Sequence, residues 1–238
     1  MTHNVLILGS GPAAIEAAKW SRASFDVIVA INNAWRVRPD WDYLIHPEDF
    51  PPKNRPNMAG STQKIVQASD YVPHQNRYGG FIYAGGTMAF TAGYWALSAL
   101  KPRVLAFFGC DMVYPKSGNT HFYGTGTADP LRADITLRDL EAKSARLMLM
   151  AAHTGCQCAN LSGTETRLIF PRTTPEAPEP INHMVLLNHP AYQAVLAREE
   201  SLGYFVASGR YWESGMALDT DEIDTLDAMW RKAHRAST

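Results

Sequence analysis

Short apolar runs alternate with longer mixed segments along the first 160 or so residues of the chain. The runs predict strands over 4–9, 25–31, 42–46, 63–67, 103–109 and 156–161. Apolar residues at helical spacing predict helices over 12–23, 87–100 and 137–153, while 47–60, 69–86 and 112–132 are expected to be loops. Strands that are apolar on both faces and alternate with helices are typical of a parallel sheet covered on both sides. We therefore expect an α/β fold with a mostly parallel sheet, helices on both of its faces and a C-terminal helical extension.

Prolines mark a change in organisation near residue 171. They recur through the segment that follows, at Pro171, Pro175, Pro178, Pro180 and Pro190. Residues 191–238 then predict one or two amphipathic helices and include an aromatic segment at 204–212. We expect one domain over 1–170 and a proline-rich linker with a helical extension over 171–238. The pattern leaves open whether the extension caps the main domain, mediates dimerisation or closes over a substrate.

Composition narrows the class of protein. The chain is 46% hydrophobic and 19% charged with a net charge of −1, as expected of a soluble globular protein. Such a balance gives no sign of a nucleic-acid partner. There is no signal-peptide pattern and no apolar stretch of the roughly 18 residues that a membrane span needs, so a cytoplasmic location is expected. The three cysteines, Cys110, Cys156 and Cys158, are too few for a disulfide framework and are expected to be small buried side chains.

A glycine turn, Gly9-Ser10-Gly11-Pro12, ends the first predicted strand. The spacing Gly9-x-Gly11-x-x-Ala14 fits the fingerprint of Rossmann-like nucleotide-binding domains, in which backbone N–H groups and a helix N-terminus face an anion. We therefore predict a Rossmann-like nucleotide-binding domain over 1–170. The alternative is a turn that needs glycine only for its geometry. The second strand ends in Asn32-Asn33 rather than in an acid, which favours a nucleotide other than NAD or FAD.

The loop after the strand at 103–109 carries the richest set of reactive side chains: Asp111, Tyr114, Lys116, His121 and Tyr123. An imidazole accepts a proton near neutral pH, so His121 is the candidate general base. The two phenols are candidates for hydrogen bonds to a phosphate, and Asp111 for ribose or metal binding or for capping the loop. His46, Glu48 and Lys116 are expected to contact the substrate. We find neither a nucleophile elbow nor a Walker motif, and no set of ligands spaced for a metal.

Five motifs, taken in chain order, resemble those of the small, metal-independent bacterial sialyltransferases. They lie at 9–13, 31–33, 86–88, 108–114 and 121–124, and the similarity covers roughly 4–162. The resemblance implies a glycosyltransferase that takes a CMP-linked sugar, inverts the sugar carbon and requires no metal. It also implies that His121 is the general base, that Tyr114 and Tyr123 stabilise the leaving phosphate and that Asn32 contacts the nucleotide. The remaining nucleotide-binding positions would be Gly9, Ser10, Gly11, Pro12, Asn33, Gly86, Thr87, Gly109 and Asp111.

Three other functions remain open. A pterin-type pyrophosphokinase shares the same sheet and motifs but needs ATP and magnesium, with carboxylates near Asp111. The fingerprint at 9–14 alone also fits an oxidoreductase that binds FAD or NAD. The third is a non-catalytic nucleotide-binding module whose extension contacts a partner. The acceptor is not identified beyond a glycan or another hydroxyl-bearing molecule, and a homo-oligomer remains an option.

Overall fold

The sheet determines where the ligand-binding edge of this molecule lies. The computed structural model describes residues 3–58, 61–114, 118–125, 133–180 and 185–237. Within them the strands are β1 (Asn4–Leu8), β2 (Val27–Ile31), β3 (Tyr43–Ile45), β4 (Lys64–Val66), β5 (Val104–Phe108) and β6 (Gln157–Asn160). Their order is β4-β3-β2-β1-β5-β6 and every neighbouring pair is parallel, which confirms the α/β fold. The direction in which successive strands are added to the sheet changes between β1 and β5. Parallel sheets of this kind bind ligands at such a point.

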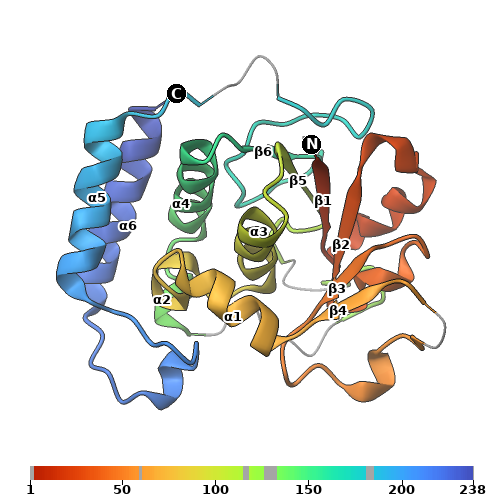
Figure 1. Cartoon of the computed structure of the whole chain (residues 1–238), viewed down its shortest axis with the longest axis horizontal. Coiled ribbons are helices and arrows are strands. Elements are labelled where there is room, and N and C mark those ends of the chain that lie inside the picture. Colours follow the sequence, from red (N-terminus) through yellow and green to blue (C-terminus); the bar gives the residue numbers. More distant parts are fainter. Residues whose placement is uncertain (1–2, 59–60, 115–117, 126–132, 181–184, 238) are drawn as a thin grey trace.

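Alternate residues of each strand enter two separate cores. Val5 and Ile7 face one side of the sheet, and Leu6 and Leu8 face the other. The first side is covered by α1 (Ala68–Asn76), α2 (Phe81–Ala84), α3 (Met88–Ala99) and α4 (Leu140–His153), as Figure 1 shows. The second side is covered by the 3₁₀ helices η1 (Pro12–Lys19) and η3 (Asn32–Arg36), and η2 (Arg22–Ser24) connects η1 to β2. The sheet is therefore buried on both faces.

Each predicted strand is present, with ends that differ by at most two residues. The single helix predicted over 12–23 is instead two 3₁₀ helices, η1 and η2, which are separated by Trp20 and Ser21. The buried residues of η1, Ala14 and Ala17, are three apart, which is the repeat of a 3₁₀ helix. The predicted loop at 69–86 is wrong, since it contains α1 and α2. There the Asp70 carboxylate accepts the Gln67 N–H at 2.8 Å and starts α1.

The C-terminal helices form a further layer outside α4. α5 (His189–Leu202) and α6 (Thr220–Arg235) pack on each other, and α6 packs on α4 (Figure 1). Short 3₁₀ helices η4 (Pro52–Asn54), η5 (Ile135–Leu137) and η6 (Tyr211–Glu213) lie in the connections. None of the described helices has the length and apolar content needed to cross a membrane.

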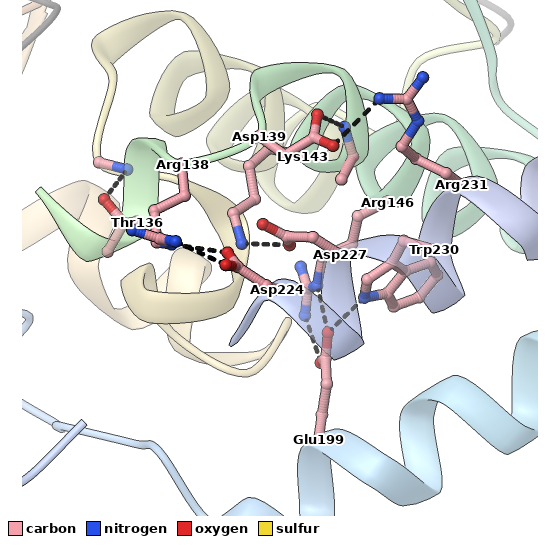
Figure 2. A network of polar contacts seen from close by, with 12 residues as sticks. Thr136, Arg138, Asp139, Lys143, Arg146, Glu199, Asp224, Asp227, Trp230 and Arg231 are labelled. Atoms are coloured by element: carbon pink, nitrogen blue, oxygen red, sulfur yellow. Dashed lines mark hydrogen bonds and ion pairs between the residues drawn. The ribbon is translucent and has the colours of Figure 1, made fainter. Parts of the chain in front are cut away.

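Buried charges join this outer layer to α4 (Figure 2). Arg146 is fully buried and makes a bidentate pair with Glu199 of α5, at 2.7 and 2.8 Å. The same carboxylate accepts the indole N–H of Trp230 on α6 at 2.8 Å. Beside it, Lys143 Nζ lies 2.6 Å from Asp227 Oδ1. A buried guanidinium is stable only with such partners, so these contacts specify how the three helices pack.

Replacing Glu199 by alanine leaves Arg146 charged and unpaired in the interior. We expect Glu199→Ala to lower the free energy of unfolding by about 3–5 kcal/mol. Glu200→Ala is the matched control, since Glu200 is adjacent in sequence but exposed. Urea unfolding of both variants measures the difference. Equal losses in the two variants would show that the buried pair does not anchor the helices.

Candidate functional site

A cavity of about 1050 Å³ lies at the carboxyl ends of β1, β2, β3 and β5. Its position coincides with the reversal of strand order between β1 and β5. Twelve of the residues predicted for the site line it: Gly9, Ser10, Gly11, Pro12, Asn32, Glu48, Gly86, Thr87, Gly109, Asp111, Tyr114 and His121. Residues that are as much as 112 positions apart are thus brought to one place.

The remaining predicted residues lie elsewhere. Asn33 and His46 are buried beside the cavity rather than on its wall, and His46 packs its ring on Phe50 at 5.0 Å. Tyr123 is exposed and stacks on the ring of His121. Lys116 falls outside the described residues. The expectation that His46 contacts the substrate therefore finds no support in its position.

The glycine turns after β1 and β5 lie directly against each other. The Gly9 N–H donates to the Phe108 carbonyl at 2.8 Å, and the Gly11 N–H donates to the Gly109 carbonyl at 2.9 Å. A Cβ atom on Gly9 would lie 2.3 Å from the Gly109 oxygen. Close contact between the turns is therefore what requires these glycines. The N–H groups of Gly9 and Gly11 already donate to backbone carbonyls. An anion at this turn would therefore contact Ser10 rather than these N–H groups.

His121 is positioned by a short loop that docks on the first turn. The Phe122 N–H donates to the Ser10 carbonyl at 3.1 Å, and His121 and Gly124 exchange two backbone hydrogen bonds. The His121 side chain is only 8% exposed, with Nδ1 at 2.9 Å from the Thr120 hydroxyl. Burial lowers the pKa of His121, so the ring is neutral near neutral pH and able to accept a proton.

Tyr114 lies beside His121, with ring centroids 6.2 Å apart. Burial raises the pKa of Tyr114 to about 12, and the carboxylate of Asp111 adds to this. The phenol consequently keeps its proton at neutral pH and is a hydrogen-bond donor. A base and a neutral donor thus stand next to each other on the wall of the cavity.

Two residues that line the cavity each have a buried acceptor oxygen with no hydrogen-bond partner within the described part of the chain. These atoms are Oδ1 of Asp111 and Oδ1 of Asn32. Burial raises the pKa of Asp111, against the opposing effect of hydroxyl groups from Ser162 and Thr166. Asn32 has a φ of 52°, in the left-handed region that asparagine tolerates. Unpartnered buried acceptors are costly, which makes both atoms candidates for hydroxyl or amino groups of a ligand.

Gly86 and Thr87 have local partners that explain their place in the fold. The Thr87 hydroxyl accepts the Phe90 N–H at 3.3 Å and caps α3, whose start lies at the cavity. The Gly86 N–H donates to the Thr136 hydroxyl at 2.9 Å. Both residues therefore have structural roles in addition to lining the cavity.

The C-terminal wall of the cavity consists of residues 208–212, in the extension whose role the sequence left open. Arg210 pairs with Glu48 at 2.6 Å, and the Tyr211 hydroxyl donates to Asp134 at 2.6 Å. Trp212 is 67% exposed and lines the same cavity. The aromatic segment at 204–212 was the only signal for this wall. The extension thus contributes to the cavity of the main domain.

The cysteines are buried and unbonded, as predicted. Burial raises the pKa of the Cys156 thiol to about 12. In the described part of the chain, no three His, Cys, Asp or Glu side chains are grouped so as to hold a metal ion.

Neither protein-family models, nor curated proteins, nor solved structures match this chain. The function of the cavity is therefore inferred from its own geometry and from the motifs in the sequence.

The contact between the two turns gives a prediction for stability. Gly9→Ala places a Cβ atom against the backbone of Gly109, and we expect a loss of about 1–3 kcal/mol from overpacking. Gly163→Ala is the control, because a Cβ atom there meets nothing within 4 Å. A fall in the thermal midpoint of about 2–4 °C per kcal/mol is expected for Gly9→Ala alone. An unchanged midpoint for Gly9→Ala would mean that the turns separate without cost.

Proposed function

We propose that the chain is a glycosyltransferase that moves a sugar from a CMP-linked donor to a hydroxyl group. The acceptor oxygen forms a bond to the anomeric carbon from the face opposite the phosphate, and the bond from that carbon to the phosphate oxygen breaks. The sugar carbon is inverted and CMP leaves with the bonding electron pair. His121 takes the proton of the acceptor hydroxyl.

The proposal rests on one observation: His121 and Tyr114 lie next to each other in one cavity, at the point where the strand order of the sheet reverses. A base for the acceptor and a neutral donor for the leaving group are the two functions that the reaction needs. A monophosphate leaving group carries less charge than a diphosphate, so a phenol hydrogen bond is a suitable stabilising group. Tyr114 fits this role better than Tyr123, which does not line the cavity and stacks on the ring of His121.

The nucleotide would lie against the first and second turns. Ser10 and Asn32 offer a hydroxyl and an amide at the ends of β1 and β2. Amides and hydroxyls both donate and accept, as a ribose or a cytosine edge requires. The unpartnered Asp111 carboxylate oxygen is suited to a donor hydroxyl of the ribose or the sugar. The resemblance of the motifs to the bacterial sialyltransferases supports the same arrangement, and the proposal requires no metal.

Removing the imidazole tests the proposal. His121→Ala is expected to reduce CMP release from a CMP-activated sugar by about 10²–10⁴-fold, which is the usual contribution of a general base. Because no metal is required, the assay contains an excess of chelator. His153→Ala is the control, since His153 is exposed at the end of α4. Circular dichroism and CMP binding show that the variant is folded. Activity of His121→Ala within a few-fold of the parent would remove His121 from the mechanism.

The pH profile tests the protonation state of the base. Burial lowers the pKa of His121 below its ordinary value of 6.5, so the neutral ring is the major form at and above pH 6.5. We expect kcat/KM to fall as the pH drops through the lowered pKa, with the midpoint of this acidic limb below pH 6.5. An acidic limb with its midpoint at or above pH 6.5 would contradict the assignment.

A further inference from the structure

The outer half of the cavity differs from the half formed by the glycine turns. It is lined by Tyr71 and Val72 of α1, Phe81 of α2 and Trp212 of the C-terminal wall. The rings of Tyr71 and Phe81 are 6.2 Å apart. A Cβ atom on Gly209 would lie 2.8 Å from Phe81 and 3.3 Å from Val72, so the C-terminal wall packs directly on this group. We call these four residues the aromatic half of the cavity.

Trp212 is the unusual member of the aromatic half. Large aromatic side chains are generally well covered, yet Trp212 is 67% exposed while it borders a cavity. Its ring meets Tyr211 edge-on at 5.2 Å, and Tyr211 is itself held by Asp134. An exposed ring on a supported segment offers a flat face to a ligand.

Most of the charged side chains that line the cavity are acidic. Among the described residues that line it, the acidic ones are Glu48, Asp49, Asp111, Asp134 and Glu165, and the basic one is Arg210. Arg210 is engaged by Glu48 at 2.6 Å. Glu48 and Asp49 act on the aromatic half: burial raises the pKa of Tyr71 to about 12, and both carboxylates contribute. An anionic group there would be repelled, and a cation would be attracted by carboxylates and ring faces together.

We propose that the aromatic half binds the acceptor through an aromatic group that carries a protonated amine. This inference rests on the proposed function, since it identifies the class of acceptor that the transferase would use. Trp212 stacks on the ring of the acceptor, and the exposed carboxylate of Asp49 attracts its ammonium group. The acceptor hydroxyl then extends toward His121 in the same cavity.

Three probes of one shape and different charge test the inference: 2-phenylethylamine, 2-phenylethanol and 3-phenylpropanoate. Dissociation constants are measured by calorimetry or ligand-observed NMR at neutral pH. The amine is expected to bind about threefold tighter than the alcohol, as a cation over aromatic rings would, and the carboxylate is expected to bind most weakly. Equal binding of amine and alcohol, a preference for the carboxylate, or binding of none of the three would overturn the inference.

Variants locate the binding in the aromatic half. Trp212→Ala is expected to weaken the amine about fivefold, with recovery in Trp212→Phe. Asp49→Asn is expected to abolish the preference for the amine over the alcohol. Leu186→Ala is the control, because Leu186 is 78% exposed and lies outside the cavity. Amine binding that is unchanged in Trp212→Ala and Asp49→Asn would place the probe elsewhere and overturn the inference.

The two proposals fail in different ways. CMP binding without binding of the amine would overturn the aromatic acceptor and leave sugar transfer standing. Amine binding at Trp212 in a protein that neither binds CMP nor releases it from a CMP-linked sugar would support the aromatic half and overturn the transferase.

Discussion

The buried pair of Arg146 and Glu199 is the interaction on which the shape of the site depends. A guanidinium stays charged in the interior, so Arg146 requires a carboxylate with good geometry. Glu199 supplies it from α5, 53 residues later in the chain. The backbone carbonyl of Glu199 accepts the Tyr83 hydroxyl of α2, and that hydroxyl accepts the Tyr204 N–H. The pair thereby fixes the start of the segment that continues to residues 208–212.

The ion pair and the glycine turns support opposite sides of one cavity. On the sheet side, Gly9 and Gly109 allow the ends of β1 and β5 to approach within backbone hydrogen-bond distance. On the outer side, the C-terminal wall is held by Arg210 and Tyr211 through Glu48 and Asp134. The packed extension therefore completes one wall of the cavity. The extension forms part of the site as well as part of the fold.

Burial acts on the central residues of the site in a consistent way. It lowers the pKa of His121 and raises the pKa of Tyr114, so that both are uncharged at neutral pH. A neutral base and a neutral donor suit a cavity whose described charges are mostly carboxylates, because a cation at either position would be drawn into ion pairs. The electrostatics of the cavity thus fit proton transfer and hydrogen bonding better than binding of a highly charged phosphate chain.

The sequence by itself determined the strands, the parallel sheet and the candidate residues at its carboxyl edge. It could do so because the wholly apolar composition of runs such as 104–108 is enough to predict that they are buried. It misread 69–86, where Pro73 and glycines indicate a loop while α1 is stabilised by packing of Tyr71 and Gln75 in the core. Only the tertiary structure decided that the N–H groups of Gly9 and Gly11 are used by backbone of the β5 turn, about 100 residues away. Likewise, the pairing of Glu48 with Arg210 joins positions 162 residues apart. Local patterns reveal which side chains are buried or polar, but partners at such separations are chosen by packing of the whole chain.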